Sequence, residues 1–252
     1  HGSAGCSCSR PLSDRIAFPG AIFAPTTPRA FAEVDVIGSV AEARINPGEG
    51  SGAPHAESGT VRRDYVKREM DEMAVQLGFV GTGGIANRHL GCAQKRDDMQ
   101  VVATCDVIME RAQEAADKYG GTAYDDHVEM LDSEDLDAIV ICTPPFAHGD
   151  IEEDACERGI HFFVEKPVAI SMKMAGRVLD AVRDSGVITQ VGYMFRKSGP
   201  IIKAQEMLSE RAIAMVQAHY YMPGLPNKGW WTKMEMGGGQ LVEQATHMLD
   251  LG

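Results

Sequence analysis

The stretch Val75-Gln76-Leu77-Gly78-Phe79-Val80-Gly81-Thr82-Gly83-Gly84-Ile85-Ala86 predicts a short apolar strand, a glycine turn and the start of a helix. Gly81, Gly83 and Ala86 have the G-x-G-x-x-A spacing of a turn that binds a dinucleotide. The first glycine allows the tight turn, the second lets the backbone approach a pyrophosphate, and the alanine lets the helix pack closely on the strand. N–H groups at the start of the helix favour the phosphates. We therefore expect six consecutive residues to bind the cofactor: Gly81, Thr82, Gly83, Gly84, Ile85 and Ala86.

A second predicted strand, residues 99–106, ends in Asp106, which lies about 20 residues after Ala86. This is the usual spacing of the carboxylate that binds the adenosine ribose of a dinucleotide. A solvated aspartate at a strand end is the alternative interpretation, but the preceding glycine turn favours the ribose. A carboxylate accepts hydrogen bonds from ribose hydroxyls and repels a 2′-phosphate, so we expect NAD rather than NADP.

Composition limits the class of protein. The sequence has 252 residues, of which 44% are hydrophobic, and a formal net charge of -12. This charge argues against a nucleic-acid or membrane partner, and no apolar run approaches the ~18 residues of a membrane-spanning helix. Cys6 and Cys8 lack the second ligand pair of a zinc site, so no metal is expected. Four other cysteines are expected to be buried free thiols of a cytoplasmic protein: Cys92, Cys105, Cys142 and Cys156.

Residues 1–72 differ in character from the rest of the chain. They begin at His1, are rich in Gly, Pro, Ser and Ala, and show no lasting helical or alternating pattern. The apolar run Ala21-Ile22-Phe23-Ala24 is too short for a secretory signal. We expect these residues to be a disordered or non-native extension, with Met73 or Met70 as the natural start.

From Val75 onward predicted strands and helices alternate, which indicates right-handed βαβ units and a parallel sheet. We therefore predict an α/β fold in which residues 73–192 form an NAD-binding Rossmann domain with a doubly wound parallel sheet. The further predicted helices are residues 110–119, 128–131, 147–158 and 172–183, and the further predicted strands are residues 138–142, 161–164 and 187–191.

The pattern changes after Gly192. Residues 201–208 predict a helix, residues 213–221 a long strand, and a glycine triplet then begins a helix that continues to Gly252. We expect residues 193–252 to be the beginning of a truncated C-terminal substrate and oligomerisation domain.

Two further stretches lie at the carboxyl ends of predicted strands, where open parallel sheets bind ligands. The first is Cys142-Thr143-Pro144-Pro145-Phe146-Ala147-His148, which either lines the cofactor or simply connects a strand to a helix. The second is Glu165-Lys166-Pro167. Its lysine is placed near a nicotinamide, although spacing alone favours a surface lysine paired with Glu165.

A third stretch follows the glycine triplet. On one continuous helix, Glu243, His247 and Asp250 would share a face at positions i, i+4 and i+7. A carboxylate one turn before a histidine can orient it for acid–base catalysis. The alternatives are a metal pair, for which no third ligand is evident, and a solvated helix face.

Together these motifs resemble the Gfo/Idh/MocA oxidoreductases from about Met73 to the end of the chain. The resemblance implies a Rossmann domain followed by an α/β domain on a large, mostly antiparallel sheet. That sheet usually forms a wall of the active site and often an oligomer interface, so we expect a homo-oligomer when the protein is full length.

The resemblance also implies roles for single residues. It makes Lys166 and His247 catalytic, and it places the family's aspartate at Glu243 and its next glycine at Ala245, which are two departures. Glu243 completes the catalytic candidates, and no metal ligand is assigned. Candidate cofactor contacts beyond the glycine turn and Asp106 are Thr143, Pro144, Pro145, His148, Glu165 and Lys166, and candidate substrate contacts are Lys166, Tyr193, Arg196 and His247.

We therefore expect an NAD-dependent oxidoreductase that transfers a hydride to or from a secondary alcohol of a sugar, polyol or inositol-like substrate. Lys166 would hydrogen-bond the reacting oxygen, and His247 would move the proton with Glu243 holding it. An NAD-dependent glycosidase that uses transient oxidation and a non-catalytic NAD-binding protein are the alternatives. The chain as given would bind cofactor and could lack activity.

Overall fold

The computed structural model describes residues 74–222, 224 and 229–252. The expectations for residues 1–72, for Cys6 and Cys8, and for a start at Met73 lie outside these residues. Within them, no helix is long and apolar enough to cross a membrane.

A six-stranded sheet organises the described residues, and every strand pair in it is parallel. The strand order β3-β2-β1-β4-β5-β6 is the doubly wound order, so the predicted Rossmann sheet is confirmed. The strands are β1 (Val75–Val80), β2 (Met99–Cys105), β3 (Thr122–Tyr124), β4 (Ala138–Ile141), β5 (His161–Val164) and β6 (Thr189–Val191). Only β3 was not predicted, because three residues are too few to show an alternating pattern.

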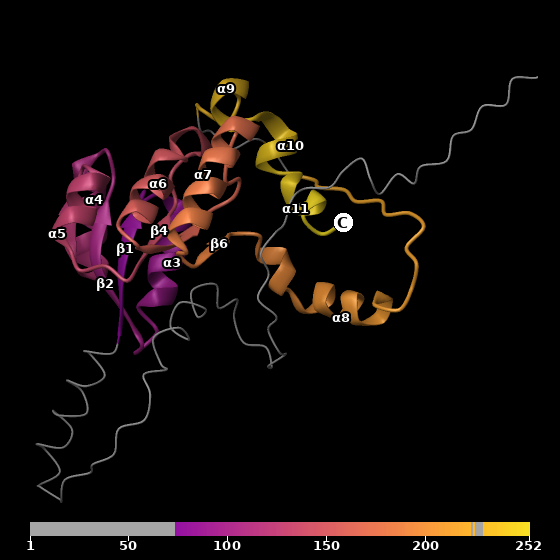
Figure 1. Cartoon of the computed structure of the whole chain (residues 1–252), viewed down its shortest axis with the longest axis horizontal. Helices are drawn as coiled ribbons and strands as arrows, with labels where there is room; N and C mark the ends of the chain where they lie inside the picture. The colour runs from indigo at the N-terminus through magenta and orange to yellow at the C-terminus, as the bar shows by residue number, and fades with distance from the viewer. Residues whose placement is uncertain (1–73, 223, 225–228) are drawn as a thin grey trace, which may run out of the picture. The chain divides into compact units, whose positions relative to one another are not determined.

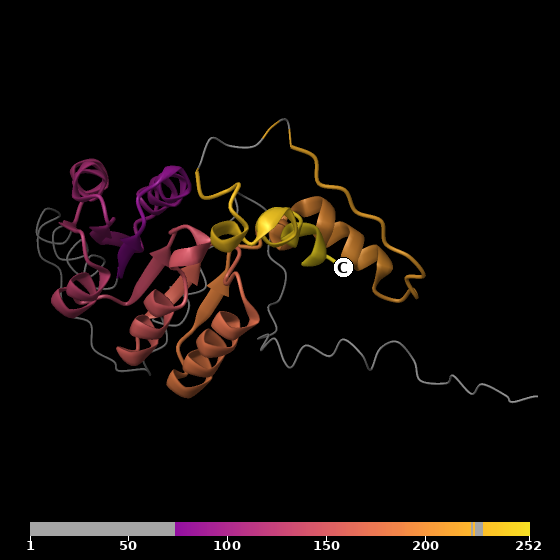
Figure 2. The same ribbon diagram turned by 90° about the horizontal axis from the view of Figure 1, so that it is seen from above.

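Helices connect these strands and cover both faces of the sheet (Figures 1 and 2). Figure 2 shows α3 and α4 on one face and α5, α6 and α7 on the other. Their bounds are α3 (Gly84–Ala93), α4 (Met109–Tyr119), α5 (His127–Ser133), α6 (Asp150–Glu157) and α7 (Met172–Ser185). The predicted helix 147–158 is in fact a short 3-10 turn, η2 (Pro145–Ala147), followed by α6. Gly149 has φ 103° and separates the two, because a helix cannot continue through that conformation.

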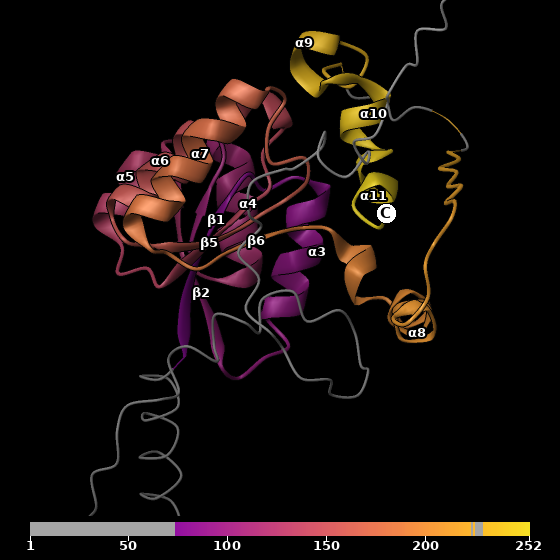
Figure 3. The ribbon, with the colours of Figure 1, turned by 45° about the vertical axis from the view of Figure 1, so that its right-hand side comes forward.

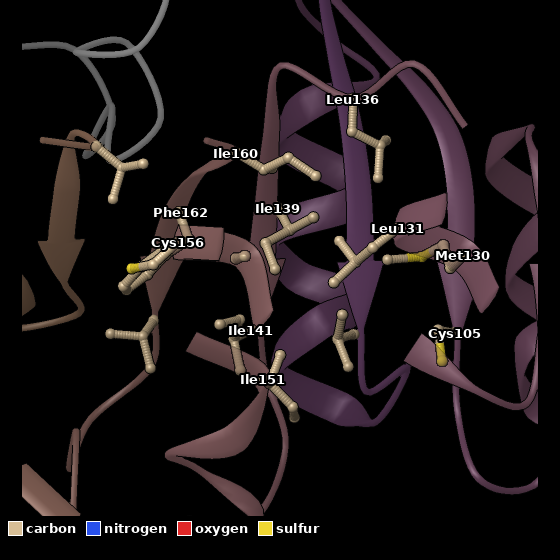
Figure 4. Packing of buried hydrophobic residues seen from close by; sticks show 14 of the residues in the cluster. Cys105, Met130, Leu131, Leu136, Ile139, Ile141, Ile151, Cys156, Ile160 and Phe162 are labelled. Carbon is tan, nitrogen blue, oxygen red and sulfur yellow. The ribbon is translucent and has the colours of Figure 1, made fainter. Parts of the chain in front are cut away.

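Two apolar cores lie on opposite faces of the sheet, and β4 contributes to both. Ile139 and Ile141 pack in the core shown in Figure 4, whereas Ala138 and Val140 pack in the other. Successive side chains of a strand point to opposite faces, so a strand covered on both sides has no exposed residue. All four residues of β4 are accordingly buried.

The four cysteines of the described chain are free thiols. Cys105, Cys142 and Cys156 are buried as expected, but Cys92 is exposed, which corrects the prediction. The reason lies in the helical period: α3 buries Ala86, Leu90 and Ala93 on one face, and Cys92 falls outside that stripe.

After β6 the chain forms short helices: η3 (Met194–Lys197), α8 (Gly199–Leu208), α9 (Met234–Gly237), α10 (Gly239–Glu243) and α11 (Thr246–Leu249). The predicted helix 201–208 is confirmed as part of α8. The predicted strand 213–221 is wrong, since this stretch has no regular structure, with Met215 82% and Tyr221 87% exposed. A strand needs a neighbour for its backbone hydrogen bonds, and no described strand pairs with this stretch.

The predicted continuous helix after the glycine triplet is also wrong. Figure 3 shows α10 and α11 as separate helices. The N–H of Ala245 donates to the carbonyl of Gln240 at 2.9 Å, a five-residue spacing that widens the last turn of α10 and ends it. Glu243, His247 and Asp250 therefore do not share one helix face.

Candidate active site

The glycine turn follows β1 at the centre of the sheet, where the strand order reverses direction. Gly81 has φ 83°, and a Cβ there would lie 2.9 Å from the backbone of Cys142 and Thr143. Only glycine fits both restrictions. Its N–H donates to the carbonyl of Cys105 at 2.7 Å, so the turn is held to the end of β2.

The next part of the turn is open. A Cβ on Gly83 or Gly84 would meet no atom within 4 Å. The N-terminus of α3 has no side-chain cap and no acid in its first turn. Neither a side chain nor a negative charge competes with an incoming phosphate there, so the site fits a dinucleotide pyrophosphate.

Asp106 lies beside this turn. Its Oδ2 accepts hydrogen bonds from the N–H of Thr82 at 3.0 Å and from Thr82 Oγ1 at 3.1 Å. Its Oδ1 accepts one from the N–H of Ile108 at 3.1 Å. These donors fix the carboxylate at the end of β2, with Val107 next to it 89% exposed.

The loop after β4 is supported from inside by His148. This side chain is 3% exposed, and its Nε2 lies 3.1 Å from the carbonyl oxygen of Thr143. The structure thus places His148 beneath the loop, whereas Thr143 and Pro144 are partly exposed and Pro145 is buried. Among the predicted cofactor contacts, His148 is therefore a support of the loop and not part of its open surface.

Lys166 follows β5 and reaches across to the C-terminal helices. Its Nζ donates to the carbonyl oxygen of Glu243 at 2.7 Å and to Glu243 Oε1 at 2.9 Å. The two side chains are 14% and 6% exposed, respectively. Lys166 is therefore not the surface lysine that spacing alone favoured, and its partner is Glu243 and not Glu165.

Glu165 instead contacts α3. Its Oε1 lies 2.8 Å from Nε2 of His89, and its Oε2 accepts the backbone N–H of Lys166 at 3.2 Å. His89 also packs edge-on against Phe163 with 5.2 Å between ring centroids. His89 was missed at the sequence level, because a single histidine on a helix gives no signal until its partner is known.

His247 lies in an aromatic enclosure and is 4% exposed. The centroids of Tyr193, Phe195 and Tyr220 lie 6.2, 5.1 and 6.1 Å from its ring. Burial lowers the pKa of His247, and the positive charge of Lys166 lowers it further. The imidazole is therefore neutral near pH 7, and its Nδ1 has no hydrogen-bond partner among the described residues.

The expected orientation of His247 by Glu243 is not found. Oε1 of Glu243 accepts hydrogen bonds from Lys166 Nζ at 2.9 Å and from Gln244 Nε2 at 3.2 Å. The break between α10 and α11 explains this, because it rotates the two residues away from a common face. Glu243 contacts Lys166 instead.

Tyr193 and Arg196 connect η3 to α11. The hydroxyl of Tyr193 lies 3.1 Å from Thr246 Oγ1. Nε of Arg196 donates to the Asp250 carboxylate at 2.8 and 2.9 Å, and this hydrogen bond raises the pKa of Arg196. Both predicted substrate contacts thus lie close to the element that bears His247. No metal-binding group of three or more His, Cys, Asp or Glu side chains occurs among the described residues.

A comparison with known protein families identifies the sheet domain. Residues 75–193 match the GFO_IDH_MocA family model, which is described as "Oxidoreductase family, NAD-binding Rossmann fold". The match begins at the first residue of β1 and ends at Tyr193, so it includes all six strands. Residues 75–193 belong to the Gfo/Idh/MocA oxidoreductase family.

Curated relatives also match the chain, one of them over more residues than the family model. The chain is 28% identical over 192 residues to D-glucoside 3-dehydrogenase of Escherichia coli K12, covering 73% of this chain and 55% of that enzyme. It is 36% identical over 127 residues to scyllo-inositol 2-dehydrogenase (NAD(+)) of Bacillus subtilis, covering 50% of this chain and 37% of that enzyme. The chain thus spans about half the length, or less, of the curated relatives that it matches.

Among solved structures, the chain resembles the WlbA dehydrogenase of Chromobacterium violaceum in complex with NADH and UDP-GlcNAcA. The TM-score is 0.63 at 23% identity, over 71% of this chain and 54% of that one. At this identity the likeness shows the fold and nothing finer.

Proposed function

We propose that the chain is the cofactor-binding part of an NAD-dependent oxidoreductase that acts on a secondary alcohol of a sugar, polyol or inositol-like substrate. The observation that supports this most directly is the Lys166–Glu243 contact beside the buried, neutral His247. It brings an ammonium donor and a proton acceptor together at the carboxyl edge of the sheet, next to a glycine turn with room for a pyrophosphate.

The cofactor fits the residues that would hold it. The open surface at Gly83 and the uncapped start of α3 suit the pyrophosphate, and the Thr143–Pro144 stretch borders the turn at Gly81. Asp106 would exchange its present donors for ribose hydroxyls, and its charge disfavours a 2′-phosphate. The relative with 36% identity is named for NAD(+), which agrees with this preference.

When bound, NAD would supply the site that accepts or donates the hydride. Lys166 has three ammonium donors, of which Glu243 takes two in the described structure, so one remains for a substrate oxygen. This donor would stabilise the negative charge that develops on the oxygen, a contribution of roughly 3–4 kcal/mol if it acts as an oxyanion donor does.

His247 would accept the alcohol proton during oxidation and return it during reduction. Its lowered pKa keeps it in the neutral form that can accept a proton near pH 7. The rings of Tyr193, Phe195 and Tyr220 exclude water from it and fix its position. Arg196, held by Asp250 but 40% exposed, would contact substrate hydroxyls.

The division of the chain belongs to the same proposal. Residues 73–192 would form the cofactor domain, and residues 193–252 the first part of a substrate domain that also mediates homo-oligomer formation. A cytoplasmic location is supported by the free state of the four described cysteines, since oxidising compartments favour disulfides.

The test has two parts. NADH binding to the 252-residue chain would be followed by fluorescence titration, and we expect tighter binding of NADH than of NADPH. The full-length protein would then be incubated with NAD and a panel of sugars, polyols and inositols, with NADH absorbance as the readout. Aryl glycosides in the panel separate a glycosidase, which releases sugar without net NADH. Absence of NADH binding would contradict the proposal.

A further inference from the structure

Two buried polar side chains, His148 and Glu152, lie beneath the loop after β4. His148 is 3% and Glu152 is 0% exposed, and both contact the loop or its continuation into α6. Thr143 Oγ1, His148 Nδ1 and Glu152 Oε1 are buried atoms without a hydrogen-bond partner among the described residues. Buried polar atoms are rarely left unsatisfied, so this group needs an explanation.

The tautomer of His148 follows from its other nitrogen. Nε2 lies 3.1 Å from the Thr143 carbonyl oxygen, which can only accept a hydrogen bond, so Nε2 bears a proton. In the neutral ring Nδ1 is then a bare acceptor. It faces Glu152 Oε1 at 3.5 Å.

The Glu152 carboxylate is also restricted by a hydrogen bond. Glu152 Oε2 accepts the backbone N–H of Gly149 at 2.5 Å, which leaves Oε1 to face the imidazole. Without a proton between them, Nδ1 and Oε1 would present two lone pairs to each other in a site without solvent. Such an arrangement leaves a buried negative charge uncompensated.

We propose that His148 and Glu152 share a single proton and together act as a positioning pair that holds the Thr143–Pro145 loop against the cofactor site. The inference rests on the proposed function for its link to NAD, whereas the shared proton follows from the two hydrogen bonds and the 3.5 Å contact between Nδ1 and Oε1. The loop also contacts α9 through η2, so the pair supports the region where the C-terminal helices meet the sheet.

Burial favours a retained proton on Glu152, while the neighbouring charges act in both directions. Burial raises the pKa of Glu152, and Asp150 raises it further, whereas the His148 ring and the Gly149 N–H lower it. From α7, Arg177 pairs with Asp150 and Glu153 and not with Glu152. The neighbouring Cys156 thiol has its own pKa raised, by burial first and then by Glu152 and Glu153.

The sequence reading did not find this pair, although its signal was present. Glu152 lies four residues after His148, and the predicted helix 147–158 would have placed the two side chains on one face. The sequence instead predicts a cofactor contact for His148. In the fold, the His148 side chain is buried and its Nδ1 faces Glu152.

The central experiment compares wild type with Glu152→Gln and Glu152→Leu. A glutamine amide can accept from Gly149 and donate to His148 Nδ1 without titrating, so it imitates the protonated acid. Leucine cannot donate. We expect Glu152→Gln to bind NADH within about twofold of wild type near neutral pH, and Glu152→Leu to bind about tenfold more weakly because His148 Nδ1 is left without a donor.

The pH dependence separates a shared proton from simple packing. Because the folded-state pKa of Glu152 is raised, its contribution to stability is complete below the unfolded-state value and declines as the pH rises through the folded value. Wild type should therefore lose melting temperature and NADH affinity relative to Glu152→Gln as the pH rises above the ordinary glutamate pKa. Nitrogen NMR of His148 should show the Nε2-protonated form in both proteins.

The two proposals can fail separately. Melting curves and NMR require no ligand, so a chain that never binds NADH would contradict the proposed function while the pH comparison still tests the pair. Identical pH profiles of melting temperature for wild type and Glu152→Gln would overturn the shared proton. So would a Glu152→Leu variant that matches Glu152→Gln in every measurement.

Discussion

The sheet domain and the C-terminal segment differ in how far their apolar side chains are buried. In the sheet, β4 has four buried residues, and its side chains alternate between two cores. In the segment after β6, α8 has no buried residue, and the predicted strand 213–221 is exposed and irregular. A pattern becomes structure only where a second element covers it or pairs with it.

The C-terminal segment is ordered where it reaches the sheet domain or packs on itself. Glu243 binds Lys166, and α9 contacts η2. The Lys166–Glu243 contact is polar, in contrast with the continuous apolar cores of the sheet. We therefore expect the sheet domain to contribute most of the stability, and the proposed chemistry to depend on the contacts at its carboxyl edge.

The largest expected effect comes from substitution of Lys166, which belongs to the sheet domain, or of His247, which belongs to the C-terminal segment. In the full-length protein, Lys166→Met and His247→Ala should each lower kcat by roughly 10²–10⁴-fold, since both act on the transition state. NAD affinity should change little, because the glycine turn and Asp106 are untouched. Glu243→Gln should cost less than Lys166→Met, since the amide and the unchanged carbonyl still accept from the ammonium. Near-full turnover in Lys166→Met would contradict the mechanism.

Truncation of one apolar side chain in each region tests the contrast in stability. Ile141→Ala in the sheet core should lower the free energy of unfolding by about 2–5 kcal/mol. Leu208→Ala in α8, where Leu208 is 42% exposed, should change it by less than about 0.5 kcal/mol. Chemical denaturation of both variants gives the comparison. Equal losses would show that α8 is covered in solution.

The glycine turn offers a matched pair inside the sheet domain. Gly81→Ala should destabilise the fold by about 1–3 kcal/mol, because its φ is positive and a Cβ would press on the backbone of Cys142. Gly83→Ala meets open space and should leave the melting temperature nearly unchanged while it weakens NADH binding. An unchanged NADH affinity in Gly83→Ala would place the pyrophosphate elsewhere.

Cofactor preference should depend on the end of β2 and on nothing in the C-terminal segment. The double change Asp106→Ser and Val107→Arg should shift preference toward NADP(H) by at least about tenfold, since it removes a negative charge and adds a guanidinium for the 2′-phosphate. Val107 is 89% exposed, so the arginine has room. Tighter binding of NADPH than of NADH by wild type would show that Asp106 is wrongly assigned.

The smallest effect concerns the pH dependence of His247. Its folded-state pKa is lowered, so the unfolded state binds the proton more readily and stability falls as the pH drops below the ordinary imidazole value. For the same reason, oxidation should show an acid limb at a pH below that value. His247→Gln should remove the limb and flatten the stability profile between weakly acidic and neutral pH. A limb that persists in this variant would assign it to another group.

Local pattern was enough to predict most of the sheet domain. The predicted strand 161–164 coincides with β5, and the glycine turn lies where the strand order requires it. Period-two and helical repeats are properties of adjacent residues, and both faces of the sheet are covered within the described chain. The same reasoning failed for residues 213–221, whose partner is not among the described strands.

The contacts among the candidate site residues were not predicted from the sequence. The sequence by itself determined that Lys166, Glu243 and His247 are present, that glycine is required at the turn, and that an acid follows the second strand. Only the tertiary structure decided that Glu243 binds Lys166, that His89 binds Glu165, and that His148 turns inward to Glu152. Each of these contacts depends on where a helix ends and which element it meets. Those outcomes are set by packing between distant residues, which no local repeat encodes.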